Sequence, residues 1–170
     1  MIRQKEHGFS LIELLIVVVI IGIIAAIAIP NLLAARRSAN ESSAVSGLRT
    51  LHGAQMTYSA TYGNGNYAGT ASGTGDTAAL TQLGTPGLVD SVLATGTKSG
   101  YNYVGARAAS STSAPATFFF SANPATSSGV TQTGARRFGI ATDGVLKTDT
   151  TSISSAFTST TVASASALGS

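Results

Sequence analysis

The residues that could carry out chemistry are few, and their spacing does not assemble a catalytic group. The chain has no cysteine, and its two histidines, His7 and His52, lie far apart. The acidic residues beyond the N-terminal third are Asp76, Asp90, Asp143 and Asp149. Nucleophilic catalysis needs a nucleophile beside a base, and a calcium loop needs densely spaced oxygen ligands. We therefore expect no catalytic residue, no enzyme activity, no cofactor and no bound metal.

One carboxylate does stand in an unusual place, inside the apolar stretch HGFSLIELLIVVVIIGIIAAIAIPN. After Glu13, no charged residue occurs from Leu14 to Ala35. A helix of that length spans a hydrocarbon core of roughly 30 Å. Arg3 and Lys5 precede the stretch, which predicts an N-terminus in the cytoplasm and a C-terminal part outside. Because a carboxylate at membrane depth is costly, Glu13 calls for a function.

Two ordinary explanations account for part of this segment. A secretory signal peptide could be cut after Ala25-Ala26 or Ala34-Ala35, although its apolar core would normally be shorter. A simple signal anchor explains the length and the basic flank. Neither explains Glu13.

The stretch GFSLIELLIVVVIIGIIAAIAIP resembles the N-terminus of type IV pilins and of the related pseudopilins of type II secretion. In that comparison residues 1–8 are a short basic leader, Phe9 is the first mature residue and Glu13 is the fifth. Pro30 falls where many pilins have a proline. The resemblance implies cleavage after Gly8 and N-methylation of Phe9 by a prepilin peptidase.

Cleavage at Gly8 would give Glu13 a partner. The new amine of Phe9 would lie within a helical turn of Glu13, and this amine and the helix dipole both favour an ionised carboxylate. The family implies that, in a fibre, Glu13 of one subunit faces the Phe9 amine of a neighbour. A subunit docked at another height would leave the carboxylate unpaired, at a cost of several kcal/mol. We therefore expect Glu13 to set the assembly register.

The helical pattern continues beyond the apolar stretch. Gly22 and Pro30 predict a kink or a locally melted stretch between them. An apolar stripe then follows at spacings of three and four residues, with Arg36, Arg37, Glu41 and Arg49 largely off it. The stripe consists of Ala44, Leu48, Leu51, Gln55, Tyr58 and Tyr62, widened by Val45. We expect the helix to end near Tyr62, before GNGNYAGT.

The remaining sequence predicts a small antiparallel sheet on the apolar stripe, which gives an α+β fold. A helical turn is expected near Ala78–Leu83. Strands are expected in GYNYVGAR, ATFFFSAN, RRFGIAT and VLKTDT, and Asp143-Gly144 should join the last two. The Ser/Thr-rich segment 152–170 would be either an edge strand or a flexible tail. The expected divisions are a leader 1–8, a membrane and assembly helix 9–35, its amphipathic continuation 36–62 and a head 63–170.

The resemblance implies a structural subunit that enters the inner membrane as a prepilin and polymerises into an extracellular filament at the cell surface. Its implied partners are further copies of itself, the prepilin peptidase, the pilus assembly platform and motor proteins. Two alternatives stay open: a major pseudopilin of type II secretion, and a minor pilin that binds DNA or a surface. Binding to nucleic acid would need a basic patch, for which Arg136-Arg137, Lys98 and Arg107 are candidates. The sequence does not choose between adhesion, motility, DNA uptake and electron transport.

Overall fold

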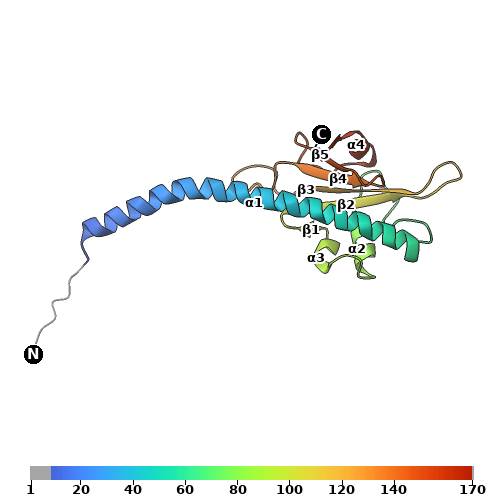
Figure 1. The fold of residues 1–170 in the computed structure, drawn as a ribbon, viewed down its shortest axis with the longest axis horizontal. Helices are drawn as coiled ribbons and strands as arrows, with labels where there is room; N and C mark the ends of the chain where they lie inside the picture. Colours follow the sequence, from blue (N-terminus) through green and yellow to red (C-terminus); the bar gives the residue numbers. More distant parts are fainter. Residues whose placement is uncertain (1–8, 170) are drawn as a thin grey trace, which may run out of the picture. The chain divides into compact units, whose positions relative to one another are not determined.

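The structure is a computed structural model that describes residues 9–169. The leader, including Gly8, lies outside the described residues. The chain divides into two compact units, 1–35 and 36–170, which are described here separately. The first unit contains the apolar part of helix α1, whose full extent is Leu11–Thr61 (Figure 1).

Helix α1 continues through both positions where a kink or a locally melted stretch was expected. Gly22 and Pro30 lie inside it, so the structure does not contain the locally melted stretch. Pro30 removes one N–H donor, but neighbouring turns of apolar, helix-compatible residues continue on both sides. A kink at these residues stays a prediction. The ends of α1 agree with the expected Phe9 and Tyr62 within two residues, which is the usual uncertainty of helix boundaries.

The second unit contains a six-stranded antiparallel sheet whose strand order in space is β1-β2-β3-β4-β5-β6, as in the sequence. The strands are β1 (Thr97–Lys98), β2 (Tyr101–Ala108), β3 (Thr117–Pro124), β4 (Arg137–Ala141), β5 (Leu146–Asp149) and β6 (Ser166–Ala167). The four strands predicted from the sequence are β2 to β5. The α+β fold is therefore confirmed.

The turn between β4 and β5 differs in detail from the expected two-residue hairpin. Ile140 pairs with Leu146, which leaves five residues between the last paired positions. The Gly144 N–H donates to the Ala141 carbonyl oxygen at 2.9 Å, so Thr142 and Asp143 form the centre of the turn. Gly144 has φ +72°, which a residue without a side chain adopts readily. The glycine thus closes the hairpin one position later than expected.

The stripe of α1 packs against one face of the sheet and forms the main core. Ala44, Leu48, Leu51 and Gln55 are buried as predicted, whereas Tyr58 is half-buried and Tyr62 is exposed. The sheet contributes Tyr101, Tyr103, Phe118, Phe120, Phe138 and Ile140. Gly47 permits a close approach, because a Cβ at this position would lie 2.8 Å from the Tyr103 hydroxyl.

The C-terminal segment covers the opposite face of the sheet. It forms helix α4 (Ser159–Ser164) and the edge strand β6, so the flexible-tail alternative is wrong. Alternate residues of a strand point to opposite faces, and Phe119 joins Phe157, Val162 and Ala106 in a second core. Gly139 leaves room for this cluster, since a Cβ there would lie 2.7 Å from Val162.

Two short helices lie between α1 and β1 in the sequence and complete the second unit. Helix α2 (Ala78–Gly84) confirms the predicted helical turn, and its Leu80 and Leu83 are buried. Helix α3 (Ser91–Ala94) begins at Asp90, whose carboxylate accepts a hydrogen bond from the Leu93 N–H at 3.0 Å. Both helices add leucines to the main core.

Candidate assembly site

Glu13 acts within its own helix as a cap. The Ser10 N–H donates to Glu13 Oε2 at 2.9 Å, one turn from the start of α1. Ser10 and Glu13 have the spacing of a capping box, in which an acidic residue at the third helical position satisfies an N–H that has no partner in the helix. This signal was present in the sequence and gives Glu13 a structural role beside the expected assembly role.

The cap uses only one oxygen of the carboxylate. Within residues 9–169, Glu13 Oε1 has no hydrogen-bond or ion-pair partner. Phe9, on the preceding turn, is 82% exposed. The arrangement can therefore hold the carboxylate in place and still offer an oxygen to a cation from outside the chain.

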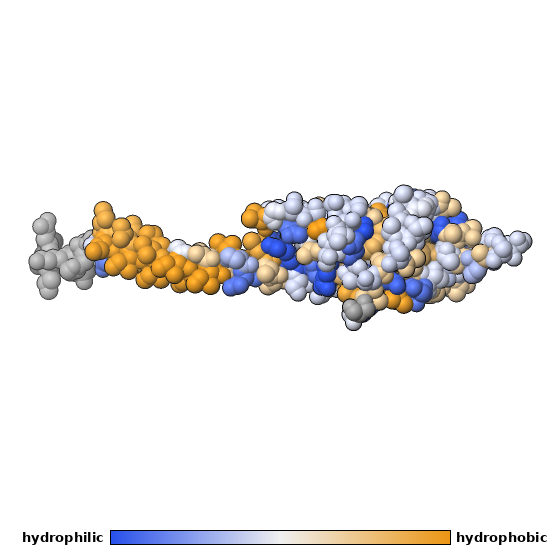
Figure 2. All heavy atoms as spheres, turned by 90° about the horizontal axis from the view of Figure 1, so that it is seen from above, coloured by the Kyte–Doolittle hydropathy of each residue, from blue (hydrophilic) through white to orange (hydrophobic). Residues whose placement is uncertain are grey.

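The large apolar residues from Leu14 to Leu32 are exposed in the single chain. Their exposed fractions run from 46% at Val17 to 68% at Leu32. Figure 2 shows this segment as a nearly continuous apolar surface on the face in view. Among the described residues, α1 is the one helix that is long and apolar enough to cross a membrane. Such a surface is stable only when lipid or other protein covers it.

Glu41 was expected largely off the apolar stripe of α1, but it lies on the packed face of this helix. It is 8% exposed, and its carboxylate accepts hydrogen bonds from the Arg136 guanidinium at 2.7 and 2.9 Å and from the Ala135 N–H at 2.8 Å. Glu41 precedes Ala44 by three residues, which is a stripe spacing. Sequence analysis did not place Glu41 on the stripe because it is charged. Its partner Arg136 is too distant in the sequence to be recognised from spacing.

Neighbouring residues of α1 contact the same loop before β4. Asn40 donates to the Thr133 carbonyl oxygen at 2.9 Å, and Arg37 Nη1 lies 3.4 Å from Gln132 Oε1. Together with Glu41 they hold the loop against the helix. These contacts connect segments more than ninety residues apart, so short-range sequence patterns could not reveal them.

Each of the four candidate basic residues has a polar partner within the described residues. Arg136 pairs with Glu41, Arg137 with Asp149, and Lys98 with Asp90. Arg107 Nε donates to the Gly69 carbonyl oxygen at 2.8 Å. Each cation is thus engaged locally, and the geometry gives little support to nucleic-acid recognition, which needs clustered cations.

The acidic residues also do not converge. No group of three or more His, Cys, Asp or Glu residues that could hold a metal ion occurs in the described part of the chain. Asp149 is committed to Arg137, and Asp143 accepts a hydrogen bond from the Val145 N–H. His52 is half-buried, and the centroid of its ring lies 5.4 Å from that of the Phe118 ring.

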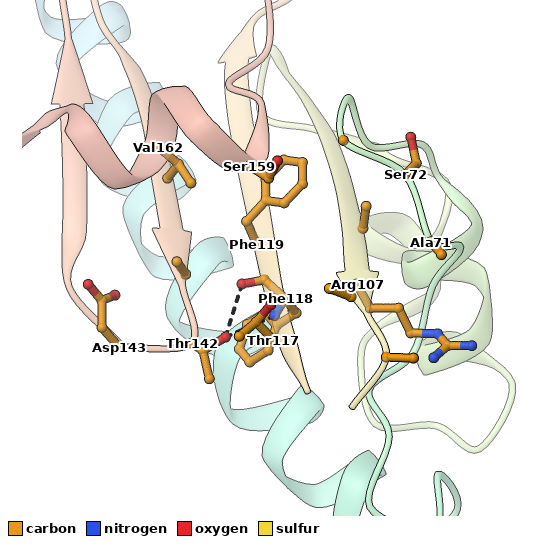
Figure 3. A pocket seen from close by; sticks show the side chains of 15 residues that line it. Ala71, Ser72, Arg107, Thr117, Phe118, Phe119, Thr142, Asp143, Ser159 and Val162 are labelled. Carbon is orange, nitrogen blue, oxygen red and sulfur yellow. Dashed lines mark hydrogen bonds between the residues drawn. The ribbon is translucent and has the colours of Figure 1, made fainter. Parts of the chain in front are cut away.

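A pocket of about 630 Å³ lies beside the second core, over the ends of β2, β3 and β4 (Figure 3). Arg107 and Asp143 stand on opposite sides of it in that view. The Thr142 hydroxyl is occupied by the backbone N–H and carbonyl of Phe118. Alanine, glycine and phenylalanine form much of the lining. The pocket therefore brings together no pair of groups suited to acid–base or nucleophilic chemistry.

Residues 3–29 match the family described as the prokaryotic N-terminal methylation motif. The chain thus carries a prepilin-type N-terminus on an α+β head. The match includes Gly8, Phe9 and Glu13, and it ends just before Pro30.

The curated relatives are pilins and secretion-system core proteins. The chain is 48% identical over 56 residues to the type IV major pilin protein PilA of Myxococcus xanthus, covering 33% of this chain and 26% of that protein. It is 62% identical over 39 residues to the type IV wide pilus major component PilA4 of Thermus thermophilus, covering 23% and 30%. It is 38% identical over 55 residues to the type II secretion system core protein G of Klebsiella pneumoniae, covering 32% and 39%. No solved structure matches.

These similarities span only a quarter to two-fifths of each relative's length.

Proposed function

We propose that this protein is a structural subunit of a type IV pilus-like filament. It enters the inner membrane as a prepilin, is cut after Gly8, is methylated at Phe9 and polymerises through its apolar helix into a filament at the cell surface. The observation that carries this proposal is the exposed apolar surface of residues 14–32, which follows a capped carboxylate, Glu13. The methylation motif and the pilin relatives support it.

The membrane and the filament cover the same surface in turn. Burial of apolar area is worth about 25 cal/mol per Å², but this gain is small between helices that are still surrounded by lipid. Net attraction between apolar helices should therefore arise as subunits leave the bilayer. Glu13 Oε1 is then available to the Phe9 amine of a neighbour, which selects one axial height.

The proposed partners follow from this sequence of events. They are a prepilin peptidase for the Gly8–Phe9 bond, an assembly platform in the membrane, motor proteins in the cytoplasm and further copies of this chain. The proposed divisions are the leader 1–8, the membrane and assembly helix 9–35, the amphipathic helix 36–62 and the head 63–170.

The second candidate is a major pseudopilin of type II secretion. The relatives named core protein G favour it, with identities of 35 to 40% over similar lengths of the chain. Both functions use the same cleavage, membrane and polymerisation steps. They differ in whether the filament extends from the cell surface under normal expression.

Electron microscopy of filaments sheared from cells, with mass spectrometry of their subunit, tests the proposal. We expect abundant filaments whose subunit has the intact mass of residues 9–170 plus one methyl group. A mature N-terminus beyond residue 25 would contradict the processing step. Absence of surface filaments, together with loss of protein secretion on deletion of the gene, would favour the pseudopilin.

A further inference from the structure

Within residues 9–169, the two arginines that follow the apolar segment have no acidic partner. Arg36 and Arg37 come directly after Ala35, the last residue of the charge-free stretch. The salt bridges within residues 9–169 are Lys98–Asp90, Arg136–Glu41 and Arg137–Asp149. Arg36 is exposed, and Arg37 is half-buried. Two adjacent guanidinium groups are therefore left uncompensated.

Glu41, which could pair with Arg37 along the helix, already pairs with another arginine. Glu41 lies four residues after Arg37, which is the spacing for an ion pair along a helix. Its two oxygens instead accept hydrogen bonds from Arg136 and from the Ala135 N–H. Arg37 Nε is buried without a hydrogen-bond partner in the described part of the chain, and Nη1 has only the 3.4 Å contact with Gln132. Arg37 thus has no anionic partner among the described residues.

The position of the pair in the sequence identifies that ligand. The apolar stretch before Arg36 matches the thickness of a hydrocarbon core, and the polar headgroup layer extends about 5–8 Å beyond that core. Residues directly after the stretch therefore lie at headgroup depth while the subunit is in the membrane. Cations on this outer flank run against the usual bias towards cytoplasmic Lys and Arg, and an anionic headgroup at this depth would compensate their charge.

We propose that Arg36 and Arg37 form a docking surface for anionic phospholipid headgroups on the outer leaflet of the membrane. Guanidinium groups bind phosphate oxygens through paired, charge-assisted hydrogen bonds. The contact fixes the height of the subunit before assembly and must break when the subunit leaves the bilayer. The inference rests on the membrane-inserted stage of the proposed function and does not require a particular filament.

The test uses the full mature chain in mild detergent with equal amounts of phosphatidylglycerol and phosphatidylcholine. Native mass spectrometry then measures the ratio of the two lipids retained by the protein. A cation near a membrane surface contributes roughly a fivefold preference for anionic lipid. We expect the wild-type chain to favour phosphatidylglycerol by at least about fivefold, and the double variant Arg36→Gln/Arg37→Gln to lose this preference.

The chain offers a matched control in Arg49→Gln. Arg49 is also exposed and has no ion pair within residues 9–169, but it lies about 20 Å further along the helix. This variant should retain the wild-type preference. The variant Arg36→Lys/Arg37→Lys keeps the charges but loses the paired hydrogen bonds, so it should retain only part of the preference. Near-UV circular dichroism checks that each variant is folded.

Three results would overturn the proposal. The first is an unchanged lipid preference in the double Gln variant, and the second is an equal loss in Arg49→Gln. The third is displacement of the lipid by millimolar inorganic phosphate, which would indicate a site for free anions. Carbonate extraction of membranes separately reports insertion, so a failure of lipid selectivity is distinguishable from a failure of the membrane stage itself.

Discussion

At the scale of single residues, Glu13 combines two roles that need different chemical properties. Capping the Ser10 N–H needs an acceptor oxygen, which a neutral amide also supplies. Pairing with a neighbour's amine needs a negative charge. The two roles can therefore be separated by substitution.

We predict that Glu13→Gln and Glu13→Ala both insert into membranes normally but both impair filament assembly. Gln retains an acceptor for the cap, whereas Ala loses it at a cost of about 1 kcal/mol in the first turn. Sheared filament yield at matched subunit levels measures assembly. Normal filament yield from Glu13→Gln would show that the cap, rather than the charge, is the required feature.

Two buried tyrosines make a second comparison at this scale. Tyr101 Oη donates to the Arg136 carbonyl oxygen at 2.8 Å, whereas Tyr103 Oη is buried without a partner among the described residues. Burial raises the pKa of Tyr103 to about 12. An unpaired buried hydroxyl costs free energy, and a paired one contributes about 1 kcal/mol.

We predict opposite effects of the same substitution at these positions. Tyr103→Phe should leave the free energy of unfolding unchanged or raise it by about 1 kcal/mol, whereas Tyr101→Phe should lower it by about 1–2 kcal/mol. Urea unfolding followed by circular dichroism measures both variants against wild type. An equal loss in the two would mean that Tyr103 has a hydrogen-bond partner in solution.

At the scale of elements, the C-terminal segment is fastened to the sheet without a disulfide. Arg137 donates to Asp149 at 2.6 and 3.0 Å, to the carbonyl oxygens of Ser155 and Ala156, and lies 4.1 Å from the centroid of the Phe157 ring. The Phe157 N–H donates to the buried Ser121 hydroxyl at 2.9 Å. Polar contacts thus hold α4 and β6 in place.

The fastening should weaken in acid. The Thr151 N–H, then the Thr151 hydroxyl and the Arg137 guanidinium, hold the pKa of Asp149 well below its usual range. The folded state therefore binds fewer protons than the unfolded chain, and the stability from Asp149 is complete above about pH 4 and is lost as the pH falls further. Asp90, whose pKa is lowered chiefly by Lys98, adds a separate contribution.

We predict that the melting temperature of the head falls below about pH 4, and that Asp149→Asn removes part of this fall. The comparison is best made in an Asp90→Asn background, which eliminates the second contribution. Thermal melts followed by tyrosine near-UV circular dichroism at several pH values provide the measurement. The same pH dependence with and without Asp149 would contradict the role given to this pair.

Some helices and strands could be predicted from sequence patterns, and others could not. Helix α1 and strands β2 to β5 were predictable because their apolar residues recur at the periods of a helix and a strand. Helix α4 and strand β1 were not predicted, and the edge strand β6 was only one of two alternatives, since short Ser/Thr/Ala segments carry no such period. The run Phe118-Phe119-Phe120 did contain a signal, because consecutive large apolar residues indicate a strand buried on both faces.

The residues of the candidate site also divide into those that local sequence patterns indicate and those that they do not. Glu13 stands out in the sequence as a charge inside an apolar stretch, and the capping box that holds it is visible from local spacing. The roles expected of Phe9 and Glu13 come from the resemblance to type IV pilins and stay predictions. Glu41, by contrast, is buried through Arg136, a partner 95 residues away. Long-range pairs of this kind depend on how the sheet is placed on α1, which residue spacing does not specify.

At the scale of the whole molecule, the two units differ in whether their apolar residues are buried. The second unit contains both cores, whereas the apolar residues of the first unit are exposed. We predict that a truncated chain beginning at Ala35 is a soluble monomer in analytical sedimentation without detergent and forms no filaments. Fibres of native appearance from this truncated chain would place the assembly contacts in the sheet.

The two outer strands of the sheet, β1 and β6, are each only two residues long. A filament of the proposed kind would line up many identical sheets side by side, where open strand edges could join neighbouring heads irreversibly. Short edges offer few unpaired N–H and C=O groups for such joining. The brevity of β1 and β6 would therefore limit irreversible, amyloid-like joining of neighbouring heads in such a filament.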